Sequence, residues 1–186
     1  MKKDSTSNNR QGSIFTLLAS VFRKQGVKPV LIGGYALIAS KVQRTTFDID
    51  FIVTSEDETR LEPGIVGVGY SVHRREGAVV QFKAEKPGLR DLDLVLTDKD
   101  TFRQLVEEGS QASIAGETFV IPCPKHLIAM KLHAIANNPE REKKDMLDII
   151  NLVRMNAMDP QSDDIRGLFK KYGLERLAGQ IPKDLP

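Results

Sequence analysis

Two aspartates separated by one residue are the groups in this sequence best suited to chemistry. Asp48 and Asp50 lie in the segment 47–53 (FDIDFIV), whose alternation predicts a β-strand. Side chains two residues apart on a strand point to one face, so the carboxylates repel unless solvent or a cation screens them. Mg²⁺ prefers such oxygen ligands, and two Mg²⁺ ions can hold both the attacking and the leaving oxygen of a phosphoryl transfer. Taken alone, the spacing also fits ordinary aspartates at a strand end.

A glycine pair precedes these aspartates. Gly33 and Gly34 end a short apolar strand over 29–33 and lead into a predicted helix over 35–41. Glycine lets the backbone approach a phosphate closely, and the free N–H groups at a helix start favour an anion. The pair could simply form a tight strand-to-helix turn. With carboxylates on the next strand, it predicts a triphosphate site beside a metal site.

A third carboxylate comes from a later strand, 92–97 (LDLVLT). Asp91 and Asp93 share one face of it, and an aspartate inside so apolar a strand is costly to bury without a partner. Asp93 is flanked by Leu92 and Leu94 and lies deeper in the strand. We therefore expect Asp93, rather than Asp91, to be the third metal ligand and a candidate general base.

Further candidates lie on predicted helices. Lys131 falls inside the apolar arc of a helix over 124–136, so it must reach solvent or meet a negative charge. A nucleotide phosphate and a structural ion pair both satisfy that requirement. In the next helix, over 140–157, Lys144, Asp145 and Asp148 fall off the apolar stripe, which predicts a solvated charged face.

The elements that must position these groups form two segments. Residues 1–12 are polar and predict a disordered tail. Residues 13–121 alternate helices and strands, and residues 122–186 predict a helical part packed on that core. The remaining predicted elements are a helix from Ser13, a helical turn over 55–60, a hairpin over 66–75 and 78–84, a helix over 100–108, a hairpin over 113–121, and helices over 162–172 and 174–179.

Composition sets broad limits. The chain has 186 residues and a net charge of +2, which neither demands nor excludes nucleic acid. The single cysteine, Cys123, rules out an intrachain disulfide and fits a reducing cytoplasm. No signal peptide and no apolar run of about 20 residues is present, so we expect no membrane association. The three histidines show no zinc-ligand spacing with Cys123 and are interpreted as incidental.

The motifs together resemble the nucleotidyltransferase superfamily, the fold of DNA polymerase beta. Gly33-Gly34, Asp48-Ile49-Asp50 and Asp93 match its pattern. The sequence is more closely similar to the group around AbiEii-type toxins, in the start Gly33-Gly34-Tyr35-Ala36 and the approach from Arg44 to Asp50. Lys131 and the stretch from Lys144 to Asp148 look like that group's helical elements, although AbiEii-type toxins are commonly longer.

The resemblance implies an α+β fold, with a small mixed sheet flanked by helices and a helical C-terminal part. It also implies two Mg²⁺ ions and an NTP substrate, with Arg44 and Lys131 contacting phosphates. The acceptor would be tRNA, a protein or a small molecule, and some members pair with an antitoxin. The alternatives are a small-molecule antibiotic adenylyltransferase and a non-catalytic binding protein. An acidic pocket would favour a cationic drug. A basic surface around Arg74, Arg75, Lys83, Lys86 and Arg90 would favour RNA.

Overall fold

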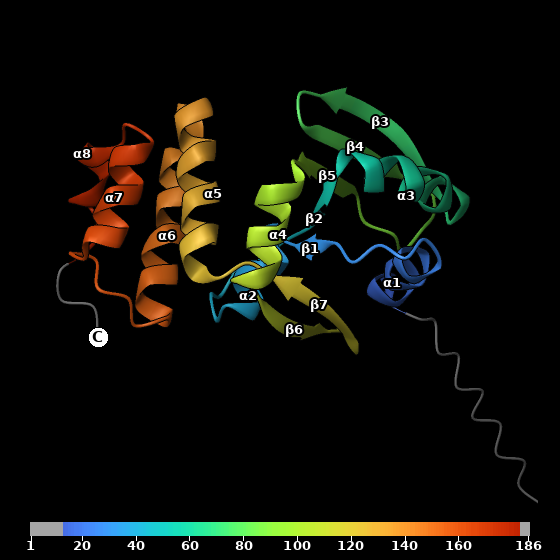
Figure 1. Cartoon of the computed structure of the whole chain (residues 1–186), viewed down its shortest axis with the longest axis horizontal. Coiled ribbons are helices and arrows are strands. Elements are labelled where there is room, and N and C mark those ends of the chain that lie inside the picture. The colour runs from blue at the N-terminus through green and yellow to red at the C-terminus, as the bar shows by residue number, and fades with distance from the viewer. Residues whose placement is uncertain (1–12, 183–186) are drawn as a thin grey trace, which may run out of the picture.

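A computed structural model describes residues 13–182, so the tail predicted over 1–12 lies outside the described residues. The chain forms a mixed sheet with helices around it, followed by a group of helices (Figure 1). The elements are, in chain order, α1 (Ile14–Lys24), β1 (Val30–Leu31), α2 (Gly33–Ala39), β2 (Ile49–Thr54), α3 (Ser55–Gly67), β3 (Tyr70–Glu76), β4 (Val79–Ala84), β5 (Leu92–Thr97), α4 (Lys99–Glu107), β6 (Ser110–Ile114), β7 (Glu117–Ile121), α5 (Pro124–Asn137), η1 (Pro139–Arg141), α6 (Glu142–Met155), α7 (Asp163–Lys171) and α8 (Glu175–Ala178).

The sheet has seven strands in the order β3-β4-β5-β2-β1-β7-β6. Strand β2 pairs parallel with β5 and antiparallel with β1, and β1 pairs parallel with β7. Two antiparallel hairpins, β3-β4 and β6-β7, form the edges. The predicted mixed α/β architecture is therefore confirmed.

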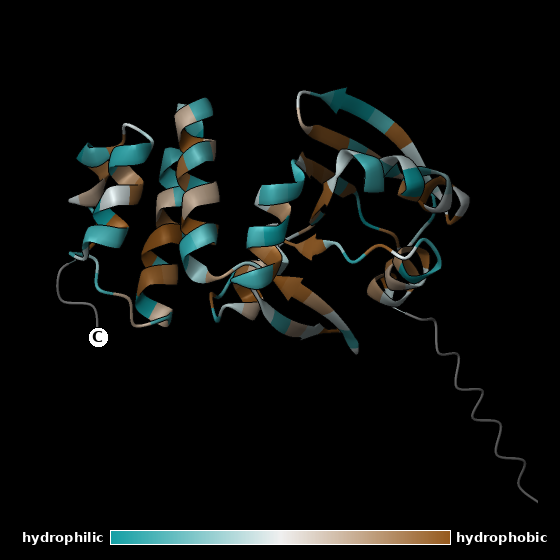
Figure 2. Cartoon of the chain, viewed as in Figure 1, coloured by the Kyte–Doolittle hydropathy of each residue, from teal (hydrophilic) through white to brown (hydrophobic). Residues whose placement is uncertain are grey.

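Buried side chains line both faces of the sheet. Ile49 and Phe51 of β2 are fully buried in the larger hydrophobic core, together with residues of α1 and α3. Ile52 points to the opposite face, where it packs with Leu105 of α4 in a smaller core. Because strand residues alternate between faces, Asp50 shares the face of Ile52. Figure 2 shows the inner strands β1 and β7 coloured mainly hydrophobic, whereas the free end of β3 is hydrophilic.

The C-terminal helices share this core. Helix α5 packs against α6 and α7, and Leu127 and Ile128 of α5 belong to the same continuous hydrophobic cluster as the strands. Helices α5 to α8 lie beside the sheet in Figure 1. The last strand ends at Ile121, and α5 begins at Pro124.

Several predicted elements differ in extent: α2 begins at Gly33 rather than Tyr35, β6 begins at Ser110 rather than Ser113, and α3 is much longer than expected. The charged segment near Ser55 forms not a single turn but the helix α3, which continues through Pro63 to Gly67. The hairpin strand predicted from residue 66 therefore begins at Tyr70. The side chain of Thr54 caps α3 by accepting from the N–H of Asp57, and three acidic residues in the first turn favour the helix start. None of the helices within residues 13–182 combines the length and apolar character needed to cross a bilayer.

Candidate active site

The predicted carboxylates come together at the start of two neighbouring parallel strands. Asp50 on β2 lies directly opposite Asp93 on β5, and Asp48 precedes β2 by one residue. A cleft of about 290 Å³ opens here, lined by Asp48, His73, Gln81, Phe82, Lys83, Asp91 and Asp93. The fold thus brings Asp93 beside two carboxylates that lie more than forty positions earlier in the sequence.

The charges at this site are poorly compensated. Burial, followed by the charges of Asp48 and Asp93, raises the pKa of Asp50 from 3.8 to about 6. Lys131 and Arg44 oppose that rise only in part. Burial also raises the pKa of Asp93, against a hydrogen bond from Gln81. Mutual repulsion of partly buried carboxylates is the electrostatic pattern that a bound cation relieves.

The donor set fits a hard divalent cation. Asp48, Asp50 and Asp93 offer only carboxylate oxygens, which Mg²⁺ prefers over nitrogen or sulfur. Thr46 Oγ1 donates to Asp48 Oδ1 at 3.2 Å, which orients one of the three groups. These three residues are the candidate metal ligands.

The glycine pair makes the close approach to these carboxylates possible. Gly33 has a φ of +63°, and a Cβ atom there would lie 1.9 Å from Asp50 Oδ2. A Cβ on Gly34 would lie 2.3 Å from Thr46 Oγ1. Side chains are therefore excluded at both positions, and the first turn of α2 presses its backbone against Asp50. No side chain caps that turn, since Ile32 occupies the N-cap position.

A buried ionic network flanks the carboxylates. Lys131 Nζ lies 2.8 Å from both Asp145 Oδ1 and Asp148 Oδ2, and Arg44 Nη1 also pairs with Asp148. Arg141 Nε donates to Asp145 Oδ2 at 2.8 Å. Burial opposes ionisation of Asp145, but Lys131 and Arg141 outweigh it and hold the pKa of this carboxyl below its usual value.

This network corrects the prediction of a solvated face on α6. Asp145 is fully buried and Asp148 nearly so, because cations from three other segments neutralise them. From the sequence, Lys131 is expected to meet either a nucleotide phosphate or a structural ion pair. The structure shows the ion pair, with Asp145 and Asp148. The Nε atom of Arg44 is buried without a hydrogen-bond partner in the described chain, so this guanidinium keeps one unused donor.

Of two further predicted residues, Asp91 lines the same cleft but is already paired, and Lys144 lies apart on α6. Asp91 accepts from Lys83 Nζ at 2.6 Å and from the N–H of Ala84 at 3.1 Å, and these bonds lower its pKa. Its charge is thus already matched by a lysine, in contrast to Asp93. Lys144 is exposed on α6 and makes no ion pair within residues 13–182.

Sequence reasoning missed two groups beside the carboxylates. Gln81 on β4 lies opposite Asp93, and its Nε2 donates to Asp93 Oδ2 at 3.3 Å. Arg141 completes the pairing of Asp145. Its position four residues before Asp145 is a helical ion-pair spacing and could have indicated the contact. Gln81 could be found only from the register of β4 against β5.

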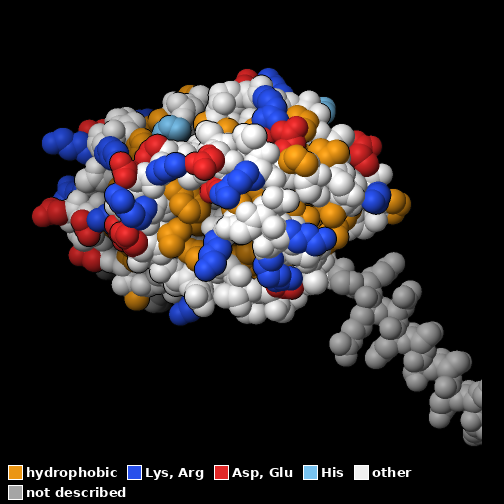
Figure 3. All heavy atoms as spheres, turned by 45° about the vertical axis from the view of Figure 1, so that its right-hand side comes forward, with side chains coloured by type: hydrophobic (Ala, Val, Ile, Leu, Met, Phe, Trp, Pro, Cys, Tyr) orange, Lys and Arg blue, Asp and Glu red, His pale blue; other side chains and the backbone are white. Residues whose placement is uncertain are grey.

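The basic residues considered for RNA binding are largely paired. Arg75 contacts Glu58 and Glu62, Arg74 contacts Glu76 at 2.8 Å, and Lys83 contacts Asp91. The side chain of Lys86 lies over Gly69, and Arg90 donates to the carbonyl of Thr46 at 2.8 Å. Figure 3 shows positive and negative side chains interspersed on the face drawn. Three of these five basic residues are therefore paired with carboxylates, and Lys86 and Arg90 contact carbonyl oxygens.

Solved structures share this fold. The antibiotic-resistance factor ANT(2'')-Ia is 14% identical, with a TM-score of 0.68 over 90% of this chain and 93% of that chain. The lincosamide antibiotic adenylyltransferase LnuA is 15% identical, with a TM-score of 0.55 over 76% of this chain and 96% of that chain. An antigenic nucleotidyltransferase-like protein from Paracoccidioides brasiliensis is 15% identical, with a TM-score of 0.54 over 92% and 94%.

No protein-family model matches the sequence, and no curated protein is significantly similar to it. At identities of 14–15% the likeness to solved structures establishes the fold. The chain therefore has the mixed α/β fold of these nucleotidyltransferases.

Proposed function

We propose that this protein transfers a nucleoside monophosphate from an NTP to an acceptor hydroxyl, with Mg²⁺ bound by Asp48, Asp50 and Asp93. The observation that carries the proposal is the convergence of these three carboxylates at the start of β2 and β5, where Asp50 lies against the bare backbone of Gly33 and its pKa is raised. Structural ion pairs also place carboxylates in protein interiors, but they match each one with a cation, as Asp145 and Asp148 illustrate.

The residues at this site have distinct roles in an in-line displacement at the α-phosphate. Bound Mg²⁺ would supply the positive charge that the attacking and leaving oxygens require. Asp93, whose pKa is raised by burial, is the candidate acceptor of the proton from the attacking hydroxyl. The first turn of α2 offers backbone N–H groups to phosphate oxygens, and pyrophosphate leaves. Arg44 and Lys131 place positive charge beside Asp50, which favours a polyanionic substrate.

For the acceptor, we propose a small hydroxylated molecule. The chain matches 95% of ANT(2'')-Ia in its complex with adenylyl-2''-tobramycin, so a compact chain of this fold accommodates such an acceptor in that protein. The pairing of Arg74, Arg75 and Lys83 removes the charge argument for RNA. A toxin acting on tRNA or on a protein, with an antitoxin partner and a cytoplasmic location, stays a prediction from the resemblance to AbiEii-type proteins.

The test is a transfer assay with labelled nucleotides. The protein is incubated with Mg²⁺, with each of the four NTPs labelled at the α- or the γ-phosphate, and with acceptor pools of aminoglycosides, lincosamides or total RNA. We expect α-label, but not γ-label, on an acceptor, with release of pyrophosphate. Asp50→Asn should abolish the transfer and Asp91→Asn should retain it. Transfer of γ-label would contradict the proposed reaction, and equal transfer by Asp50→Asn would contradict the proposed site.

A further inference from the structure

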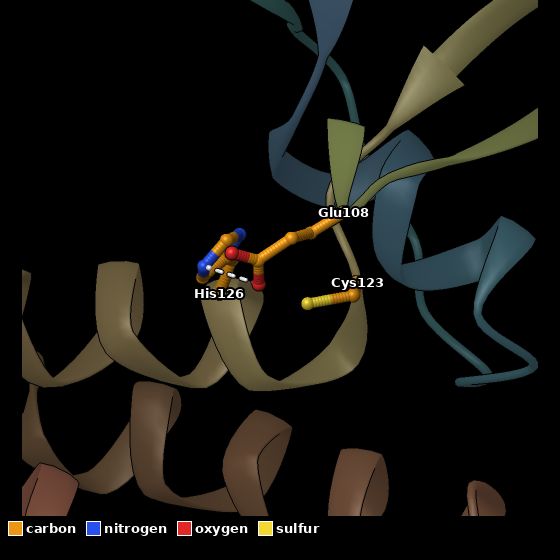
Figure 4. A group of neighbouring side chains, drawn as sticks. All are labelled: Glu108, Cys123 and His126. Carbon is orange, nitrogen blue, oxygen red and sulfur yellow. Dashed lines mark ion pairs between the residues drawn. The ribbon is translucent and has the colours of Figure 1, made fainter. Parts of the chain in front are cut away.

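A second group of metal-binding side chains lies outside the carboxylate site. A carboxylate oxygen of Glu108, the sulfur of Cys123 and a ring nitrogen of His126 all lie within 4.8 Å of one another. Figure 4 shows the three side chains pointing toward one another, with Glu108 at the end of α4 and Cys123 and His126 at the beginning of α5. The prediction that the histidines are incidental rests on spacing along the sequence, whereas Glu108 joins Cys123 and His126 only through the fold.

A close backbone contact brings Glu108 to the other two residues. Glu108 is the C-cap of α4, and Gly109 follows it. A Cβ on Gly109 would lie 2.6 Å from the carbonyl oxygen of Leu105 and 2.7 Å from that of Ile121, so only glycine fits this contact. Ser110 then pairs with Ile121 at the start of the β6-β7 ladder. The end of α4 is thereby fixed beside the residues that follow β7.

The start of α5 presents the sulfur and the imidazole on the same turn. Cys123 is the N-cap residue and His126 is the third residue of the helix. Side chains at these two positions face each other, as they do in a capping box. The thiol of Cys123 makes no capping hydrogen bond, so its sulfur is not engaged by the helix.

The three groups retain unused ligand capacity. Gln104 Nε2 donates to Glu108 Oε1 at 2.8 Å, which orients the carboxylate and leaves Oε2 facing His126 Nε2 at 3.4 Å. His126 Nδ1 is buried and has no hydrogen-bond partner within the described residues. Buried polar atoms normally have a hydrogen-bond partner, so the unpartnered Nδ1 of His126 is an exception that a bound ligand would explain.

We propose that Glu108, Cys123 and His126 bind one Zn²⁺ ion. Thiolate, imidazole and carboxylate are the three ligand types that zinc uses, and the thiolate and imidazole disfavour Mg²⁺. Two anionic ligands match the charge of the ion. The half-exposed side chain of Glu108 gives solvent a route to the site and leaves room for water as a fourth ligand.

The proposed zinc site lies where α4 and α5 meet, so the ion would link these two helices. The ion ties the end of α4 to the first turn of α5, the helix that carries Lys131 and its buried pairs with Asp145 and Asp148. Zinc binding would therefore stabilise the junction between the sheet and the C-terminal helices. The site is separate from the carboxylate cleft, because none of the three ligands lines that cleft.

A thiol-protection experiment tests the proposal. Cys123 is the single cysteine of the chain, so a thiol reagent such as 5,5'-dithiobis(2-nitrobenzoate) reports on this position alone. The chelator-treated, reduced protein is titrated with Zn²⁺ or with Mg²⁺, and the rate of Cys123 modification is measured. We expect one equivalent of Zn²⁺ to slow the modification at least tenfold and Mg²⁺ to leave the rate unchanged. In parallel, Co²⁺ should give a sulfur-to-cobalt charge-transfer band.

Matched variants separate this site from the rest of the chain. His126→Gln and Glu108→Gln should each weaken Zn²⁺ affinity by more than roughly 100-fold, because losing even a residue that only hydrogen-bonds to a metal ligand typically costs 10- to 100-fold. His133→Gln, which alters a histidine two turns further along α5, and Asp50→Asn should bind Zn²⁺ like the wild type. A modification rate that Zn²⁺ does not change would overturn the proposal. So would wild-type affinity in Glu108→Gln, whose exposed side chain can change without loss of the fold.

Discussion

Replacing Asp50 with asparagine should stabilise the metal-free protein while removing its metal-dependent function. The native pKa of Asp50 is about 6, against 3.8 for an ordinary aspartate, because burial and two neighbouring carboxylates disfavour its charge. The native state therefore binds more protons than the unfolded state between these two values, so stability falls as pH rises through that window. Asparagine keeps the shape of the side chain and removes the charge.

The expected difference in unfolding free energy between Asp50→Asn and the wild type follows from the linkage between proton binding and stability. The interval from 3.8 to about 6, at roughly 1.36 kcal/mol per pH unit, corresponds to about 3 kcal/mol. Asp50→Asn should be more stable than the wild type by up to about 3 kcal/mol near pH 8. Near pH 5, where the native carboxyl is mostly protonated, the same relation leaves about half of that difference.

The assay is urea unfolding of both proteins in the presence of a chelator, followed by fluorescence or circular dichroism at several pH values. Adding Mg²⁺ should stabilise the wild type and leave Asp50→Asn unchanged. Asp91→Asn is the matched control: this carboxylate is paired with Lys83, so its replacement should not stabilise the protein. A lower stability of Asp50→Asn than of the wild type near pH 8 would contradict the raised pKa of Asp50. So would a difference in stability that does not shrink as the pH is lowered.

Two further predictions concern the groups around the carboxylates. Gly33→Ala should destabilise the protein by more than Gly26→Ala and should abolish nucleotide binding. Both positions have a φ near +65°, but only at Gly33 would a Cβ atom meet Asp50. Equal losses of stability in thermal unfolding would refute that contact. Lys131→Ala should cost about 3–5 kcal/mol in urea unfolding, because it leaves the buried carboxylates of Asp145 and Asp148 short of a cation. The exposed Lys144→Ala should stay within about 0.5 kcal/mol of the wild type, and a similar cost for both variants would contradict the buried network.

Local patterns in the sequence predict much of this fold and the heart of the site. Alternation in the segment 47–53 places Asp48 and Asp50 at the start of β2, and Gly33-Gly34 marks the turn that presses against them. The C-terminal helices follow from their apolar periodicity and from Pro124, Pro139 and Pro160. These features depend on residues close together in the chain, where spacing alone determines which side chains share a face.

The remaining features depend on contacts between distant segments. The pairing of Asp50 with Asp93 requires β5 to lie beside β2, although a hairpin separates them in the sequence. Asp145 and Asp148 fall off the apolar stripe of α6, yet they are buried because Arg44 and Lys131 approach from other elements. Hydrophobic periodicity predicts which apolar side chains are buried, but it does not predict buried ion pairs. Glu108 likewise meets Cys123 only through the packing of Gly109.

Asp48, Asp50 and Asp93 are proposed to form a metal-dependent nucleotide site. The most direct measurement is calorimetric titration of the wild type, Asp93→Asn and Asp91→Asn with ATP, GTP, CTP and UTP, each with and without Mg²⁺. We predict Mg²⁺-dependent binding of at least one nucleotide by the wild type and by Asp91→Asn, and its loss in Asp93→Asn. Binding that is independent of Mg²⁺, or that persists unchanged in Asp93→Asn, would contradict the claim.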